Sequence, residues 1–327
     1  MTGLSDSFQR PINYLRISVT DRCNLRCIYC MPENGVKLMQ HQDILTYEEI
    51  NIVVQAAAQM GINKVRITGG EPLVRLDLPR LVAMLAQIDS IDDISLTTNG
   101  TMLGGCAAEL KSAGLKRVNI SLDTLNPDRF EFITRGRSLA DVLEGIEVAR
   151  SVGLEPVKIN MVVMAGINDD EVLDFAARTI DDGWHVRFIE YMPVVTGGVV
   201  VPPTVPVSEV RKRLESMWVL ESCLPAVGNG PARYFRFPQA SGTIGFITPV
   251  SEHFCFQCNR LRLTADGKLR PCLLAEDEID LRQPLRDGIS LNGLKELIKE
   301  AVARKPRGHQ LSNGYRLQGR PFSQVGG

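Results

Sequence analysis

Short β-rich runs alternate with longer runs of helical period over residues 14–190. Glycine, asparagine or aspartate bounds most of the short runs, as is common for strands. The longer runs carry helix signals: Thr46 with Glu49 fits a capping box, and Gly61 stands where a helix would end. The six predicted strands are residues 15–19, 64–68, 93–98, 116–122, 156–163 and 185–190.

This alternation predicts an α/β fold. Strands joined through helices are parallel, because a helical crossover returns the chain to the same end of the sheet. Six βα units fall short of the eight that close a full barrel, so we prefer an incomplete (β/α)6 TIM-like barrel to a doubly wound sheet. In both folds, ligands bind at the carboxyl ends of the strands.

The character of the sequence changes after residue 191, where a stretch rich in proline, glycine and valine begins. A helix candidate and three strand-like pieces follow, at residues 208–218, 232–237, 244–248 and 260–264. We therefore place a domain boundary near residue 195. Residues 1–195 would form the barrel, and residues 196–327 a smaller C-terminal cap domain.

Composition is that of an ordinary soluble protein, with 44% hydrophobic residues, 23% charged residues and a net charge of -1. The near-zero charge argues against nucleic-acid binding. The uncharged stretch from Met192 to Ser208 contains four prolines, so we expect no membrane span. The first residues show no signal peptide, which favours a cytoplasmic location.

In a reducing compartment, eight cysteines indicate metal ligands rather than disulfides. Cys106 and Cys223 stand apart from the others, and we expect them to be buried packing residues. The other six form two triads.

Cys23, Cys27 and Cys30 form the first triad, a C-x3-C-x2-C motif directly after the first predicted strand. A [4Fe-4S] cluster normally takes four cysteines, so three would leave one iron open to another ligand. A zinc knuckle is the alternative, although structural zinc prefers four protein ligands. The segment TDRCNLRCIYCMPE, with Tyr29 before the last cysteine, resembles the radical S-adenosylmethionine (SAM) superfamily. The resemblance implies that the open iron binds SAM, which is cleaved to a radical that abstracts hydrogen from substrate.

Cys255, Cys258 and Cys272 form the second triad, and nearby His253 keeps a zinc site open on spacing alone. The segment CNRLRLTADGKLRPCL and the terminal Gly-Gly, taken with the first motif, resemble the GTP 3′,8-cyclase family of molybdenum cofactor biosynthesis over nearly the whole chain. The resemblance implies a second [4Fe-4S] cluster on this triad, facing the substrate.

The family resemblance also implies a reaction. A 5′-deoxyadenosyl radical removes the 3′ hydrogen of the GTP ribose, and the ribose radical attacks carbon 8 of guanine. The partners that the resemblance implies are an electron donor such as flavodoxin or ferredoxin and, as the next pathway enzyme, cyclic pyranopterin monophosphate synthase. It also allows a homodimer. Two other classes stay open: a different radical SAM enzyme with an auxiliary cluster, such as a peptide maturase, and a zinc-binding interaction module.

Small and polar residues follow several predicted strands. Gly70 would let a ligand approach the backbone, and Glu71 could accept hydrogen bonds from a ligand ammonium group. The resemblance implies contacts with SAM for Tyr29, Gly70, Ser121 and Met192, and a contact with the substrate for Thr97.

Basic residues lie inside four of the predicted strands, where alternation could point them inward. Solvated charge on outer faces is the alternative, but buried cations need anionic partners and phosphates are suitable ones. Arg260 and Arg262, two apart, would share one face of an extended segment. The resemblance assigns Arg16, Lys158, Arg260 and Arg262 to the GTP phosphates, and Arg66 and Arg187 to the substrate pocket.

The chain ends in Gly326 and Gly327. Chain ends are ordinarily solvated tails. The preceding segment, however, mixes apolar and basic residues that could pack, and glycines without a Cβ can enter a narrow cleft. The resemblance implies that this tail inserts into the substrate pocket.

Overall fold

The structure is a computed structural model that describes residues 3–136, 138–192, 202–224, 227–228, 230–309, 320 and 322–326. All six predicted strands are present, each within two residues of its predicted bounds. They are β1 (Tyr14–Ser18), β2 (Lys64–Thr68), β3 (Asp93–Thr98), β4 (Arg117–Ser121), β5 (Lys158–Val163) and β6 (His185–Glu190). The helices among them are α1 (Tyr47–Ala58), α2 (Leu78–Ala86), α3 (Ala107–Ser112), α4 (Pro127–Thr134), α5 (Leu139–Ser151) and α6 (Val172–Asp181).

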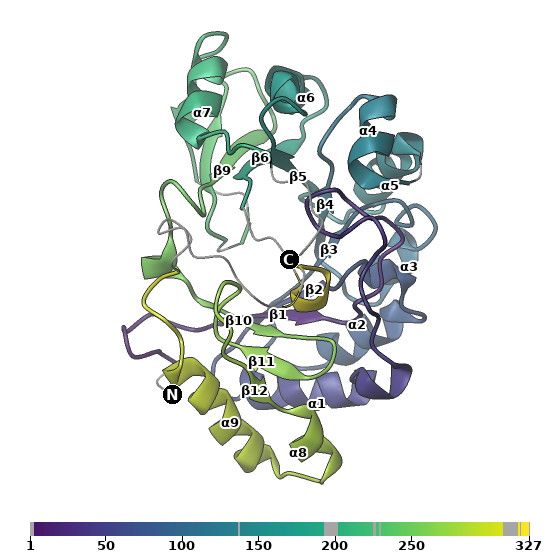
Figure 1. Ribbon diagram of the computed structural model, residues 1–327, viewed down its shortest axis with the longest axis vertical. Coiled ribbons are helices and arrows are strands. Elements are labelled where there is room, and N and C mark those ends of the chain that lie inside the picture. Colours follow the sequence, from purple (N-terminus) through teal and green to yellow (C-terminus); the bar gives the residue numbers. More distant parts are fainter. Residues whose placement is uncertain are drawn as a thin grey trace.

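Strands β1 to β6 are neighbours in chain order, and every adjacent pair is parallel. The predicted α/β fold with a parallel sheet is therefore confirmed. Figure 1 shows α1 to α6 on the outer side of this sheet and the short C-terminal helix, α10 (Phe322–Val325), on its inner side. Helix α1 begins at the predicted capping box, in which the Glu49 amide donates to Thr46 Oγ1 at 3.1 Å.

The C-terminal part of the chain extends the same sheet at both edges. Strand β9 (Thr243–Ile247) pairs in parallel with β6, and β10 (Arg260–Leu263) pairs in parallel with β1. Within the described residues the result is one mostly parallel sheet of twelve strands. The remaining elements are α7 (Val207–Glu215), β7 (Glu221–Ser222), β8 (Arg233–Arg236), β11 (Lys268–Arg270), β12 (Ile279–Asp280), α8 (Arg282–Arg286), α9 (Leu291–Ala303) and α10 (Phe322–Val325). The predicted boundary near residue 195 lies outside the described residues.

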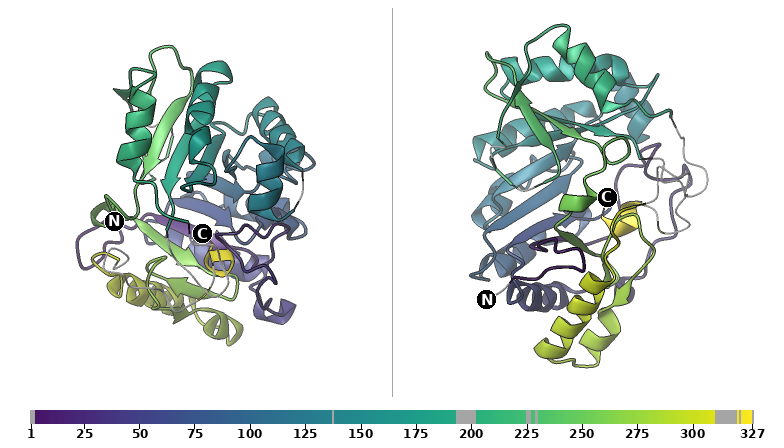
Figure 2. Two further views of the ribbon diagram at one scale, coloured as in Figure 1. Left: turned by 45° about the horizontal axis from the view of Figure 1, so that its top comes forward. Right: turned by 90° about the vertical axis from the view of Figure 1, so that its left-hand side faces the viewer.

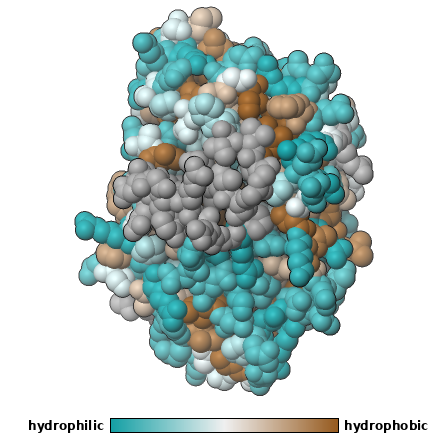
Figure 3. Space-filling view, in the orientation of Figure 1, coloured by the Kyte–Doolittle hydropathy of each residue, from teal (hydrophilic) through white to brown (hydrophobic). Residues whose placement is uncertain are grey.

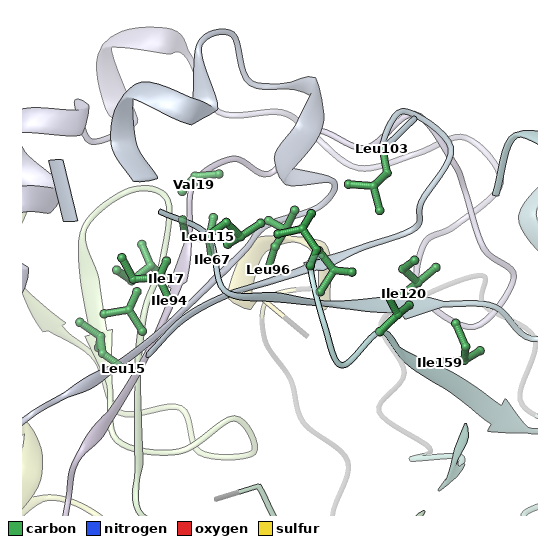
Figure 4. Packing of buried hydrophobic residues seen from close by; sticks show 14 of the residues in the cluster. Leu15, Ile17, Val19, Ile67, Ile94, Leu96, Leu103, Leu115, Ile120 and Ile159 are labelled. Atoms are coloured by element: carbon green, nitrogen blue, oxygen red, sulfur yellow. The ribbon is translucent and has the colours of Figure 1, made fainter. Parts of the chain in front are cut away.

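Alternate positions of the strands build the hydrophobic core. Leu15, Ile17, Ile67, Leu96 and Ile120 are fully buried and pack together, as Figure 4 shows. Because successive side chains of a strand point to opposite faces, the intervening positions lie on the inner face. The same six strands therefore supply both the core and the opposite surface of the sheet.

The C-terminal residues lie beside that inner face in both views of Figure 2. On the face drawn in Figure 3, hydrophilic residues predominate over the region of β10 to β12, α8 and α9. Of the helices in the described residues, none combines the length and the apolar character needed to cross a lipid bilayer.

Candidate active site

A pocket of about 370 Å³ lies on the inner face of the sheet. This volume is in the range of small-molecule sites. Within the described residues, every predicted site residue except Gly326 lines it: Arg16, Cys23, Cys27, Tyr29, Cys30, Arg66, Gly70, Thr97, Ser121, Lys158, Arg187, Met192, Cys255, Cys258, Arg260, Arg262 and Cys272. Gly327 lies outside the described residues. Two cysteine triads far apart in the sequence thus meet at one pocket.

The loop that carries the first triad follows β1 and is held by backbone contacts. The Ile28 amide donates to the carbonyl of Ile133, at the end of α4, at 2.9 Å, and the Cys30 amide donates to the Cys27 carbonyl at 2.9 Å. The Leu25 amide donates to Cys23 Sγ at 3.4 Å. These contacts fix three sulfurs on one side of the pocket.

The three cysteines are half-buried, in surroundings where a thiolate would be costly. Burial raises the pKa of Cys23 to about 11 and that of Cys30 to about 12, although the backbone amide of Ser323 lowers the latter. Burial and the neighbouring thiols also raise the pKa of Cys27. Metal binding deprotonates cysteine and offsets the desolvation of the thiolate. The triad therefore fits an iron-sulfur cluster that binds one thiolate on each of three irons.

Gly70 and Glu71 have roles within the protein that the sequence did not predict. The Gly70 amide donates to the Thr20 carbonyl at 2.7 Å, and a Cβ at Gly70 would lie 2.4 Å from the carbonyl oxygen of Arg22. The buried Glu71 carboxylate accepts from the Thr98 hydroxyl at 2.7 Å and from the Asn99 amide at 2.7 Å. Glu71 therefore joins two strand-end loops while it also lines the pocket.

The predicted SAM-binding residues line the same pocket as the first triad. Tyr29 Oη donates to Asp123 Oδ2 at 2.7 Å, and Asp123 Oδ1 accepts from the Val162 amide at 2.8 Å. Burial raises the pKa of Asp123 to about 6. Ser121 ends β4, and Met192 packs beside Leu274, close to the second triad. This wall thus combines carboxylates with small polar groups, which suits a zwitterionic, sulfonium-bearing cofactor.

The second triad lines the same pocket. Cys255 is in a short 3-10 helix (Cys255–Gln257), Cys258 precedes β10, and Cys272 follows β11. Although burial opposes it, Arg260 and Lys305 lower the pKa of Cys258 to about 6. In the part of the chain that the structure describes, no three His, Cys, Asp or Glu side chains are placed to share a single ion. A thiolate among cations again fits a cluster ligand.

The two cysteines outside the triads are only half-buried. Cys106 packs against the main core from the turn before α3, and Cys223 follows β7. The predicted packing role therefore holds for Cys106, but neither side chain is buried, because both stand at element ends. His253 is exposed, and its ring lies edge-on to that of His309 with centroids 5.6 Å apart.

A row of arginines crosses the inner face of the sheet. Arg262, Arg16 and Arg66 are paired in register on β10, β1 and β2. Arg66 is in turn opposite Ser95, which is opposite Arg117. Burial, together with Arg260, lowers the pKa of Arg262 to about 9, and burial with Arg262 and Arg66 lowers that of Arg16. Like charges held this close favour an anionic ligand.

Lys158 and Arg187 continue this positive surface. Lys158 is 2% exposed, donates to the Val227 carbonyl at 2.5 Å and lies 5.4 Å from the ring centroid of Tyr234. Burial and three nearby arginines lower its pKa to about 6. Burial likewise lowers the pKa of Arg187 to about 10. Among the described residues, seven basic side chains and three carboxylates line the pocket, so its net charge favours a polyanion.

Several buried polar atoms in the pocket wall lack a protein partner. Thr97 Oγ1, Asn160 Oδ1 and Ser323 Oγ have none among the described residues. Buried polar groups are rarely left unpaired, so these atoms are available to a ligand. The sequence analysis missed Arg117 and Asn160, which line the pocket. Each occupies an inward position of a predicted strand, which the alternation could have indicated.

The C-terminal segment reaches the inner face of the sheet. Ser323 and Val325 are buried, and Arg262 Nη1 donates to the carbonyl oxygens of Val325 and Gly326. Gly326 has a φ of +67°, and a Cβ there would lie 2.7 Å from Thr68 Cγ2. Only glycine combines this backbone conformation with this close approach.

Comparisons with known proteins agree with this geometry. Residues 17–178 match the Radical SAM superfamily, and residues 184–311 match Molybdenum Cofactor Synthesis C. The chain is 52% identical over 324 residues to the GTP 3′,8-cyclase of Moorella thermoacetica, covering 99% of this chain and 100% of that protein. It is 53% identical over 328 residues to the GTP 3′,8-cyclase of Pelotomaculum thermopropionicum, with 99% and 100% coverage.

The crystal structure of Streptococcus suis SuiB bound to SAM is similar in fold. Its TM-score is 0.60 at 15% identity, covering 87% of this chain and 68% of that chain. At this identity the likeness concerns the fold alone.

Proposed function

Because the chain belongs to the GTP 3′,8-cyclase family of the radical SAM superfamily, we propose that the pocket between its two cysteine triads is the site where it cyclises GTP. The reaction is the SAM-dependent radical conversion of GTP to (8S)-3′,8-cyclo-7,8-dihydroguanosine 5′-triphosphate, an early step of molybdenum cofactor biosynthesis. The observation that supports this site most strongly is the meeting of both triads and the buried arginine row at one pocket.

Cys23, Cys27 and Cys30 would hold one [4Fe-4S] cluster, and Cys255, Cys258 and Cys272 a second. With SAM bound, the first cluster supplies a 5′-deoxyadenosyl radical that removes the ribose 3′ hydrogen. Tyr29, Gly70 and Ser121 orient SAM from the wall of the pocket, and Met192 contacts it from the side of Cys272. The hydrogen bond between Tyr29 and Asp123 keeps this wall rigid.

The cations of the pocket bind the triphosphate. Arg16, Lys158, Arg260 and Arg262 contact the phosphates, while Arg66, Thr97 and Arg187 line the part that holds the nucleoside. Charge-assisted hydrogen bonds from arginine to phosphate are strong and directional. Holding the triphosphate in this way fixes the ribose and base between the two triads, and a closed pocket excludes water from the radical step.

The C-terminal Gly-Gly tail acts in the radical step, and its Gly326 lies beside Arg262. The contact between Arg262 and the Gly326 carbonyl supports this role. Arg262 would then bind both the phosphates and the tail, so that substrate and tail are positioned by the same guanidinium.

The domain organisation is part of the proposal. Residues 1–195 form an incomplete (β/α)6 barrel, and residues 196–327 form a C-terminal cap domain that carries the second cluster. The two family matches meet between residues 178 and 184, ahead of β6, which supports two parts of the chain but a junction earlier than residue 195. The proposal also includes a cytoplasmic location and a homodimer. Its partners are an electron donor such as flavodoxin or ferredoxin and, as the next enzyme, cyclic pyranopterin monophosphate synthase.

The test is anaerobic reconstitution followed by iron and sulfide counting. Two cubane clusters require about eight irons per chain, and a count near four would contradict the proposal. Cys27→Ala should abolish cleavage of SAM to 5′-deoxyadenosine. Cys258→Ala should retain some cleavage but form no cyclised product, because it leaves the first triad intact. Full cyclase activity in both variants would refute the site.

A further inference from the structure

Lys305 is a buried cation next to the second triad that the proposed function does not use. It follows α9 and is 3% exposed. Among the described residues, the lysines that form ion pairs with carboxylates are Lys268 and Lys299, and Lys305 is not one of them. A buried ammonium without a carboxylate needs another source of negative charge and acceptors for its three N–H donors.

The acceptors of Lys305 all belong to the triad segments. Its Nζ donates to the Arg260 carbonyl at 2.7 Å and to the Pro271 carbonyl at 2.6 Å, and it hydrogen-bonds the sulfur of Cys258. Arg260 stands two residues after Cys258, and Pro271 directly precedes Cys272. One ammonium group therefore joins the two segments that carry these cysteines and reaches one of their sulfurs.

The chain that directly follows Lys305 is fixed to the remaining cysteine of the triad, Cys255. Arg10 is buried, pairs with Asp6, and donates to the carbonyls of Cys255 and Pro306, each at 2.7 Å. The backbone amide of His309 hydrogen-bonds the Cys255 sulfur. Lys305 thus lies in a segment whose position is set independently of its own side chain.

We propose that Lys305 is a positioning residue for the second cluster, which orders the Cys258 and Cys272 segments and raises the reduction potential of the cluster bound there. A cluster on three thiolates becomes more negative on reduction. A buried cation and an N–H···S hydrogen bond stabilise this reduced form, and both effects are known to tune cluster potentials. The inference rests on the proposed second cluster.

The experiment uses the full chain with Cys23, Cys27 and Cys30 replaced by alanine, so that only the second triad can hold a cluster. In this background, Lys305→Met removes the cation and Lys305→Arg retains it. Lys299→Met, on the exposed face of α9, is the matched control. Each protein is reconstituted anaerobically, and its iron and sulfide, unfolding temperature and midpoint potential by redox titration with electron paramagnetic resonance are measured.

We expect about four irons per chain in the background and in Lys299→Met. Lys305→Met should lower the equilibrium constant for reduction at least tenfold, about 59 mV for one electron, and Lys305→Arg should restore most of it. Loss of iron in Lys305→Met but not in Lys305→Arg would equally support the proposal.

Unchanged iron and potential in Lys305→Met would overturn the proposal. Loss of iron and a lowered unfolding temperature in both variants would overturn it too, because Lys305 would then act only in folding. A background without iron would instead refute the second cluster itself, which separates that failure from a failure of Lys305.

Discussion

Lys158 provides the sharpest test of the anion site, because its buried ammonium is held among cations. Burial, followed by Arg187, Arg117 and Arg66, lowers its pKa from 10.5 to about 6. At pH 7, about nine in ten Lys158 side chains are therefore neutral when the pocket is empty. A bound triphosphate would restore the ordinary pKa, so we predict that GTP binding takes up about 0.9 proton at pH 7.

The magnitude follows from the pKa. Each pH unit above 6 adds about 1.4 kcal/mol to the cost of charging Lys158, so at pH 8 the cost is about 2.7 kcal/mol. The affinity of the wild type for GTP should fall up to about tenfold per pH unit between pH 7 and pH 9. In Lys158→Met this dependence should be absent, and the loss of affinity caused by the substitution should be largest near pH 6.

Calorimetry measures both quantities in reconstituted enzyme without SAM, in buffers of different ionisation enthalpy. The γ-phosphate of GTP itself titrates near pH 6, so the difference between the wild type and Lys158→Met isolates the lysine. Lys299→Met is the control for loss of a positive charge at the surface. Equal proton uptake by the wild type and Lys158→Met would refute the inference that Lys158 faces the triphosphate.

The stability of the ligand-free protein should show the opposite effect. Because the folded pKa of Lys158 is below the unfolded pKa, the unfolded chain binds more protons between pH 6 and pH 10.5, and stability rises with pH across this window. Lys158→Met removes this penalty. It should therefore raise the unfolding temperature at pH 7, with a gain that shrinks toward pH 10. A destabilised Lys158→Met at pH 7 would contradict this.

Three further predictions concern other parts of the pocket. Arg262→Ala should weaken GTP binding by about 1.5 to 3 kcal/mol, the range for hydrogen bonds to charged groups. Binding of guanosine, which has no phosphates, should change little. An equal loss of affinity for guanosine would mean that Arg262 acts only through the tail. Gly326→Ala would place a Cβ 2.7 Å from Thr68 Cγ2. The yield of cyclised product should therefore fall at least tenfold, which corresponds to about 1.4 kcal/mol in the activation barrier, while the iron content stays unchanged. Undiminished turnover would argue against insertion of the tail. Gly70→Ala would place a Cβ 2.4 Å from the Arg22 carbonyl oxygen and displace the loop of the first triad. The variant should therefore bind only the second cluster, about four irons per chain. A count of eight irons would show that the loop tolerates the side chain.

The sequence predicted the elements well where the signal is local. Each of β1 to β6 combines a short β-rich run with flanking turn residues, and the Thr46 capping box marks the start of α1. It did not predict that β9 and β10 join opposite edges of the same sheet. Strand pairing depends on contacts between residues far apart in the chain, and the periodicity of one segment carries no information about its partner.

The same limit applies to the site. The inward arginines of β1 and β2 were identified from alternation within single strands, but their register with Arg262 depends on β10, more than 190 positions later in the chain. The internal hydrogen bonds of Glu71 were not predicted, because its partners Thr98 and Asn99 belong to the next strand end. Local motifs therefore named the chemical groups of the site, while the sheet decided which of them meet.

The strands that hold the core also limit how the site can vary. On β1, Leu15 and Ile17 are fully buried in the core, whereas Arg16 between them lines the pocket. On β2, Ile67 is likewise fully buried in the core, and Arg66 lines the pocket. A one-residue slip of either strand would bury an arginine against the helices and move an isoleucine into the pocket, so the large apolar core enforces the register of the cations. Packing on the far side of the same strands thus holds the arginines close together despite their mutual repulsion. Binding of a polyanion would offset that repulsion.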